Sequence, residues 1–121
     1  MVEYRLTHAA RADIESILAR SHQQFGQQAR RRYEALIVAA IRNATSHDKH
    51  PGFRPRPELG PDVFTWHLSH SRDRSAETKV SRPRHFLVCK RNADMLVIGR
   101  VLHDAMDLTQ HADVGEDLSE L

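Results

Sequence analysis

The segment HFLVCKRNADMLVIGRVLH, residues 85–103, constrains the fold more than any other part of the chain. Two strand-like apolar runs flank the turn RNAD, in which Asn92 and Asp94 are turn-forming residues. The short spacing predicts that the two runs pair as antiparallel strands. The second run, MLVIGRVLH, is apolar on both faces, which is typical of a strand in the interior of a sheet.

Periodicity predicts three further elements upstream. Alternation over residues 2–6 predicts a short strand with one buried face made by Val2, Tyr4 and Leu6. Thr7 suits the N-cap of a helix, and Gly26 marks the break before a second helix. The apolar faces of the two helices comprise Ala10, Ile14, Ile17 and Leu18, and then Ala29, Tyr33, Leu36, Ile37, Ala40, Ile41 and Ala44. Two such helices joined by a short connection predict a helical hairpin.

The middle of the chain is less regular. Four prolines and two glycines between residues 47 and 62 predict a loop without regular structure. The run VFTWHL predicts a strand, and the polar residues 69–83 predict a mobile insertion before residue 85. The fold class is therefore α+β, in the order β-α-α-β-β-β, with a helical hairpin packed on a small antiparallel sheet.

Length and charge place limits on the class of protein. With 121 residues we expect a single domain with a small core, part of whose stability comes from a partner. Residues 69–91 carry a net charge of +5, and the tail at 104–121 carries −6. This asymmetry favours a basic surface for an acidic partner. No signal peptide and no membrane-spanning run is seen, so we expect a cytoplasmic protein that does not bind a membrane.

Arg100 lies among aliphatic residues in the longest strand, where an unpaired charge would be costly. The favoured interpretation is a structural ion pair, with Asp104, Asp107 or Glu58 as partner. The alternative is a cleft on the sheet, in which Arg100 holds a phosphate or a partner's carboxylate. His103, at the end of the same strand, is either a general acid or, as we prefer, a rim histidine bonded to a carbonyl.

The other candidate residues favour structural roles. Trp66, the single tryptophan, either fills the core, which we expect, or is an exposed anchor for a partner. Cys89, the single cysteine, is expected to be buried and inert. A zinc site from His67, His85 and His103 is disfavoured, because surface histidines are commoner and no HExxH or CxxC motif occurs. No phosphate loop or nucleophile elbow is present, so we expect no metal and no cofactor.

Several segments together resemble the ParE branch of the ParE/RelE toxins of bacterial type II toxin–antitoxin systems. They are YRLTHAARADIESI, RPRPELGPDV, HFLVCKR and GRVLHDAMDLTQH. The last is similar to the family pattern of a strand ending R-[IV]-L-H-x-x-M-D, followed by a histidine. The resemblance implies a helical hairpin on a small sheet, a growth-arresting toxin, and a cognate antitoxin, with a 2:2 complex in which the antitoxin binds DNA.

The branch decides the implied mechanism. ParE members are associated with poisoning DNA gyrase, whereas RelE members cleave messenger RNA on the ribosome. The M-D after His103 and the absence of a late tyrosine favour the gyrase-directed branch, in which the toxin needs no chemistry of its own. Residues proposed to contact the target or partner are Arg82, Arg84, Arg100, His103, Asp107 and Trp66.

Two other hypotheses remain open from the sequence. One is a ribosome-dependent, metal-independent endoribonuclease that uses His103 as acid or base, with Arg100 and Arg91 on the phosphate. The other is a non-toxic module that retains only antitoxin binding. The insertion at 69–83 departs from the family, in which the link between these strands is usually short.

Overall fold

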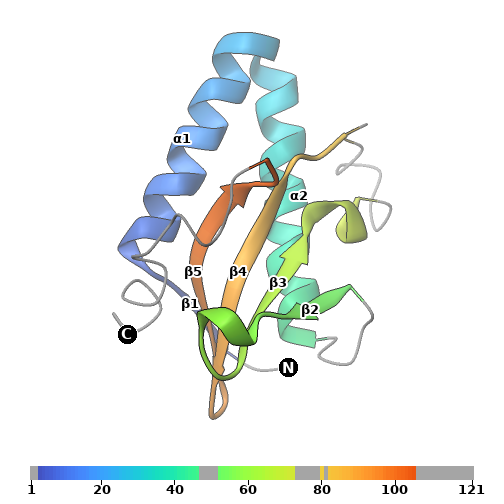
Figure 1. The fold of residues 1–121 in the computed structure, drawn as a ribbon. Helices are drawn as coiled ribbons and strands as arrows, with labels where there is room; N and C mark the ends of the chain where they lie inside the picture. The colour runs from blue at the N-terminus through green and yellow to red at the C-terminus, as the bar shows by residue number, and fades with distance from the viewer. Residues whose placement is uncertain (1–2, 47–51, 73–79, 81, 106–121) are drawn as a thin grey trace.

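The computed structural model describes residues 3–46, 52–72, 80 and 82–105. A five-stranded sheet carries the fold, and a helical hairpin lies against one of its faces (Figure 1). The elements are β1 (Glu3–Leu6), α1 (His8–Phe25), α2 (Gln27–Ser46), β2 (Phe53–Pro55), β3 (Val63–His67), β4 (His85–Asn92) and β5 (Met95–His103), with 3-10 turns η1 (Pro57–Leu59) and η2 (Leu68–Ser71). The predicted α+β class and the packing of a helical hairpin on the sheet are confirmed.

Thr7 and Gly26 define the two ends of α1. Thr7 caps α1, because its hydroxyl accepts a hydrogen bond from the Ala10 N–H at 3.0 Å. The helix continues through the polar residues before Gly26 and ends at Phe25. Gly26 then adopts φ 92°, a conformation that L side chains rarely adopt. The break predicted at Gly26 is therefore confirmed.

The main core lies between the hairpin and the sheet. The predicted apolar faces of both helices supply it, with Leu36, Ala40 and Ala44 fully buried. The sheet contributes the side chains that alternate toward the helices, which are Trp66, Leu87, Cys89, Leu96 and Ile98. Cys89 is buried as expected, and burial raises the pKa of its thiol.

A second apolar cluster lies on the other face of the sheet. It is formed by Val63, Phe86, Val88, Val97 and Leu102. These residues occupy strand positions that alternate with those of the main core. The central strands β4 and β5 are therefore buried on both faces, as the sequence predicted for the run MLVIGRVLH.

The sheet is mixed rather than wholly antiparallel. Strands β2 to β5 pair antiparallel, but β1 pairs parallel with β5, from Glu3 opposite Met95 to Leu6 opposite Ile98. Of the predicted buried face of β1, Tyr4 is 49% exposed and Leu6 is partly buried, whereas Val2 lies outside the described residues. As an edge strand, β1 is held by its backbone pairing more than by its side chains.

The proline-rich segment contains regular structure, contrary to expectation. Residues Phe53–Pro55 form β2, and η1 follows at Pro57–Leu59. A proline is tolerated in β2 because this strand is the outer edge of the sheet, where one side of the backbone needs no partner. The first residues of the insertion predicted at 69–83 belong to η2, where Ser71 is buried.

A β-bulge interrupts β5 at Gly99. The neighbours Val88 and Cys89 pair with Arg100 and Ile98, which leaves Gly99 as an extra residue. Beyond Ile98, β5 has no strand on the β1 side. The start of α1 takes over this edge, since the Thr7 hydroxyl donates to the Gly99 carbonyl at 2.7 Å.

Candidate functional site

Three strands, β3, β4 and β5, bring a charged cluster to the end of the sheet where β5 stops. Asp104 is its centre. Arg84, which precedes β4, donates from Nε to both carboxylate oxygens of Asp104 at 3.0 and 3.2 Å. Its Nη2 lies 2.9 Å from Oδ1. His67, at the end of β3, contacts Asp104 Oδ2 through Nε2 at 3.0 Å.

The hydrogen bonds of this cluster fix the ionisation of Asp104 and the tautomer of His67. The Arg84 guanidinium, and after it His67, lower the pKa of Asp104 to about 2, so the carboxylate is charged at neutral pH. The same hydrogen bond raises the pKa of Arg84. His67 accepts the Ser69 N–H at Nδ1, 3.1 Å away, so its neutral form carries the proton on Nε2. That proton is donated to Asp104.

A second pair of histidines lies beside the cluster. His85 and His103 are directly opposite each other on β4 and β5, with ring centroids 5.2 Å apart. The Tyr33 hydroxyl from α2 shares a hydrogen bond with His85 Nδ1 at 2.6 Å and accepts the Arg84 N–H at 3.3 Å. Burial, and after it the neighbouring His103, lower the pKa of His85 to about 4. Burial also raises the pKa of Tyr33 to about 12.

Arg100 makes a structural ion pair, but with a different carboxylate from those considered. Its Nε and Nη2 donate to Asp13 of α1 at 2.8 and 3.1 Å, and both side chains are 17% exposed. Asp13 also accepts the Val101 N–H at 2.9 Å, which satisfies a backbone donor on the free edge of β5. The partner could not be inferred from proximity, because 87 residues separate it from Arg100 in the chain.

His103 accepts a hydrogen bond instead of donating one to a carbonyl. Its Nδ1 receives the Ala105 N–H at 3.0 Å, just after the end of β5. The other candidate, Arg91, stacks over Phe64 with its guanidinium carbon 5.7 Å from the ring centroid. Arg91 pairs with Leu96, so His103 lies seven residues further along β5, roughly 20 Å away. The fold does not bring Arg91 and His103 together.

Trp66 is fully buried and donates from Nε1 to the Ser71 hydroxyl at 3.0 Å. Core packing is therefore the correct interpretation, and the exposed anchor is wrong. Among the remaining partner candidates, Arg82 and Arg84 are exposed on the segment before β4. Asp107 lies outside the described residues, as do residues 73–79 of the insertion and most of the acidic tail.

Within the described residues, no three histidine, cysteine or acidic side chains lie close enough to hold a metal ion. In the same part of the chain, no helix is long and apolar enough to cross a membrane.

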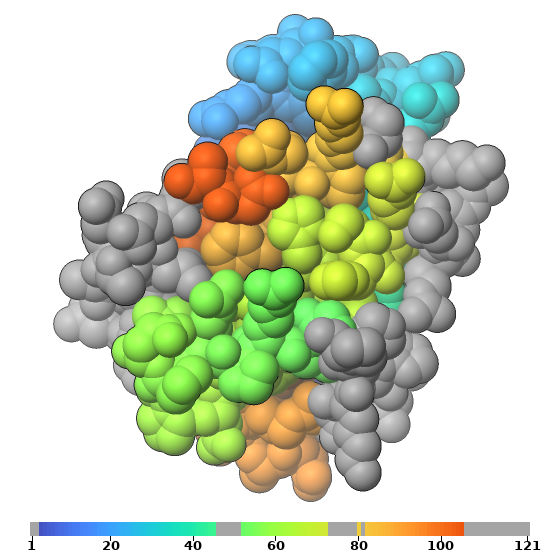
Figure 2. Space-filling view, turned by 45° about the vertical axis from the view of Figure 1, so that its right-hand side comes forward, coloured from blue at the N-terminus to red at the C-terminus, as the bar shows by residue number. Residues whose placement is uncertain are grey.

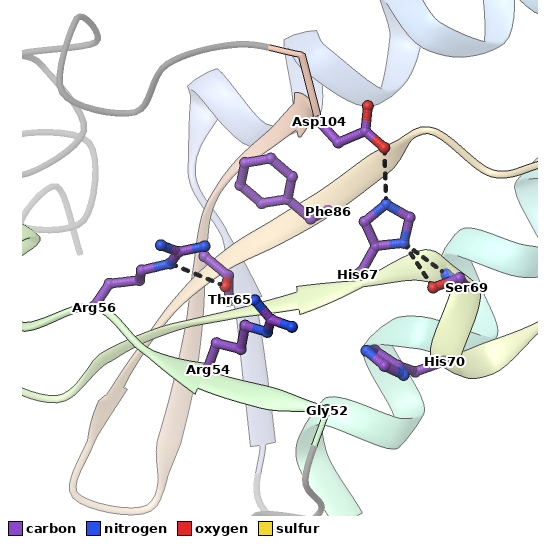
Figure 3. Close-up of a pocket in the computed structure, with 9 residues that line it drawn as sticks. All are labelled: Gly52, Arg54, Arg56, Thr65, His67, Ser69, His70, Phe86 and Asp104. Carbon is purple, nitrogen blue, oxygen red and sulfur yellow. Dashed lines mark hydrogen bonds and ion pairs between the residues drawn. The ribbon is translucent and has the colours of Figure 1, made fainter.

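A hollow of about 400 Å³ opens on the face of the sheet opposite the helices. We call it the sheet-face hollow; its lining residues are Gly52, Arg54, Arg56, Thr65, His67, Ser69, His70, Phe86 and Asp104. In the space-filling view, the green atoms of the β2 region and the red atoms at the end of β5 border it (Figure 2). Figure 3 shows Arg54 and Arg56 extending from the β2 side, with His67 and Asp104 across from them.

Arg54 and Arg56 were missed by sequence reasoning. They belong to RPRP, which we had assigned to an irregular loop. The available signal was the spacing of the two arginines, because alternate residues of an extended strand share a face. The prolines concealed this signal, since they are depleted in strands.

Comparison with known proteins identifies the class. A family model described as ParE toxin of type II toxin-antitoxin system, parDE, matches residues 4–108. The chain therefore belongs to the ParE toxin family, and the resemblance seen in the sequence is confirmed.

A solved structure shares the fold. It is titled "Chromosomal ParDE TA system from P. aeruginosa", and it matches with a TM-score of 0.61 at 16% sequence identity. The match covers 85% of this chain and 96% of that one. No curated protein matches the chain.

Proposed function

We propose that this protein is the toxin of a type II toxin–antitoxin system, that it inhibits DNA gyrase in the cytoplasm, and that a cognate antitoxin neutralises it. The observation that carries the proposal is the family match over residues 4–108, which spans the hairpin and all of the sheet except Glu3. A small DNA-binding antitoxin in a hetero-oligomer is the expected partner.

The positions of the candidate catalytic residues favour a gyrase inhibitor over a nuclease. A metal-free ribonuclease needs an acid, a base and phosphate-binding cations around one scissile bond. Arg100 is engaged by Asp13, and Arg91 lies at the opposite end of β4 from His103. These three residues therefore offer no shared site for a phosphodiester.

The exposed surface suits a protein partner. Phe25, Tyr4 and Val38 are 74%, 49% and 42% exposed, and two of them lie on the helical hairpin. A partner that covers these side chains would gain from removing their apolar surface from water. Arg82 and Arg84 add exposed positive charge near the sheet, which would favour an acidic antitoxin segment.

Induced expression in a bacterial host tests the toxin assignment. We expect growth arrest when the chain is expressed alone, and relief when the open reading frame beside its gene is expressed with it. Normal growth at a verified level of folded protein would contradict toxicity and support the non-toxic binding module.

His103→Gln distinguishes the two toxic mechanisms. A gyrase inhibitor needs no proton transfer, so we expect the variant to arrest growth as strongly as the parent protein. Loss of toxicity in a variant whose thermal unfolding is unchanged would instead support the nuclease.

A further inference from the structure

We propose that the sheet-face hollow is a phosphate-binding site, with Arg54 and Arg56 as the principal ligands. The proposal goes beyond the proposed function and does not depend on it. It rests on the shape of the hollow, on the balance of charge within it, and on the hydrogen bonds that its side chains have and lack.

Within the part of the chain that the structure describes, Arg54 and Arg56 have no carboxylate partner. Among the described residues, the side chain of Arg54 makes no ion pair or hydrogen bond, and that of Arg56 makes only a long 3.4 Å contact from Nε to the Thr65 hydroxyl. By contrast, Arg84 and Arg100 each bind a carboxylate with two or more contacts. Two guanidiniums therefore present unused donors on one wall of the hollow.

Asp104, the carboxylate that lines the hollow, does not neutralise the charges of Arg54 and Arg56. Asp104 is held by Arg84 and by the Nε2 proton of His67. Both oxygens of Asp104 are thus occupied, and its charge is balanced by Arg84 before Arg54 and Arg56 are considered. The hollow therefore carries a net positive charge.

The arrangement favours a phosphate over a carboxylate. Arg100 with Asp13 shows that one guanidinium fork takes up both oxygens of a carboxylate. Two forks on one wall can be satisfied together by a group with three or more acceptor oxygens, which a phosphate supplies. Arg54 and Arg56 are alternate residues of an extended segment, and both side chains line the hollow, where one such group could bind both.

The sheet-face hollow is large enough for a phosphate together with the organic group that carries it. About 400 Å³ falls within the range of pockets that hold small organic ligands. Phe86 adds an apolar side chain to the lining. His67 adds no donor in its neutral form, because both ring nitrogens are already engaged by Ser69 and Asp104.

Binding measurements with the purified full chain test this inference. The probes are inorganic phosphate, a nucleoside 5′-monophosphate, and short single-stranded DNA and RNA oligomers, titrated calorimetrically at low salt. We expect Arg54→Gln with Arg56→Gln to weaken binding by about tenfold or more. For the oligomers, the slope of log affinity against log salt should fall by about 0.7 for the one phosphate contact removed.

Arg30→Gln with Arg31→Gln is the matched control, because it removes the same charge from exposed positions on α2. The control should bind every probe as the parent does. Phosphate binding as tight as oligomer binding would identify a free phosphate as the source, whereas tighter oligomer binding would identify a nucleic-acid backbone.

Three results would overturn the proposal. They are no binding of any probe at low salt, equal weakening in the two double variants, and arginine-dependent binding of an oligoglutamate peptide without binding of any phosphate. The last would assign the hollow to an acidic peptide. None of these results bears on gyrase inhibition, which is measured separately.

Discussion

At the scale of single residues, the ion pair between Arg100 and Asp13 has the clearest structural role. It joins the start of α1 to the part of β5 that lies beyond the bulge, and Asp13 also satisfies the Val101 N–H. Loss of either side chain leaves a largely buried charge without its partner. The pair therefore sets the position of the helical hairpin on the sheet.

Arg100→Ala and Asp13→Ala should each lower the free energy of unfolding by about 2 kcal/mol, since both side chains are mostly buried. The double variant should lose about 1 kcal/mol less than the sum of the single losses, because each single variant already breaks the pair. Urea unfolding of the four proteins measures this coupling. Strictly additive losses would show that the two side chains act independently.

Arg100→Ala should also lose toxicity through this loss of folded protein. The check is to compare growth arrest with the soluble, folded fraction of the variant in the same cells. A non-toxic Arg100→Ala protein that folds as well as the parent would show that Arg100 contacts the target directly.

The buried histidine of β4 makes stability depend on pH. The pKa of His85 falls from 6.5 to about 4 on folding, mainly through burial. Between these values the unfolded chain binds a proton that the folded chain does not. The contribution of His85 to the free energy of unfolding is therefore fully present above pH 6.5, and it is lost as the pH falls toward 4.

The free energy of unfolding, measured with urea across this pH range, should have a slope against pH that corresponds to the uptake of up to about one proton by His85. His85→Gln should remove that slope, whereas His22→Gln, at an exposed site on α1, should keep it. An unchanged slope in His85→Gln would mean that other groups cause the acid sensitivity.

At the scale of elements, the helical hairpin depends on a glycine with a positive φ. Gly26 has φ 92° and ψ 178°, and an added Cβ would meet no atom within 4 Å. Gly26→Ala should therefore destabilise the protein through backbone strain alone, by about 1–3 kcal/mol. Thermal or urea unfolding measures the loss, with Gln27→Ala as the neighbouring control. An equal stability of the two variants would mean that the turn relaxes without cost.

The local elements were largely predictable from sequence, because each depends on its own periodicity. The helical stripes, the Thr7 cap, the break at Gly26 and the β4–β5 hairpin all appear where the pattern placed them. The errors arose where a neighbour decides the outcome. Strand β2 exists because β3 offers it a pairing edge, although Pro55 disfavours a strand.

The candidate site was less predictable, because its contacts are distant in the chain. Asp13 with Arg100 and Tyr33 with His85 join residues 87 and 52 positions apart. The sequence pattern indicated that Arg100 needs a carboxylate, but not which one. Likewise, the alternation of Arg54 and Arg56 has meaning only once β2 is known to be extended.

At the scale of the whole molecule, one face of the sheet supports the fold and the other is partly open. The hairpin covers the first face and buries Trp66 and Leu87. The second face carries the sheet-face hollow and, at its end, the cluster around Asp104. A target or antitoxin can therefore reach charged side chains on this face without disturbing the main core.

The most direct test of the proposed function is a cleavage assay with purified gyrase, supercoiled plasmid and this protein. If the protein inhibits gyrase, linear DNA trapped with gyrase accumulates as the protein is added. The His103→Gln variant then produces as much linear DNA as the parent protein. No linear DNA, under conditions in which a known gyrase poison produces it, would contradict gyrase inhibition and direct attention to messenger RNA on the ribosome.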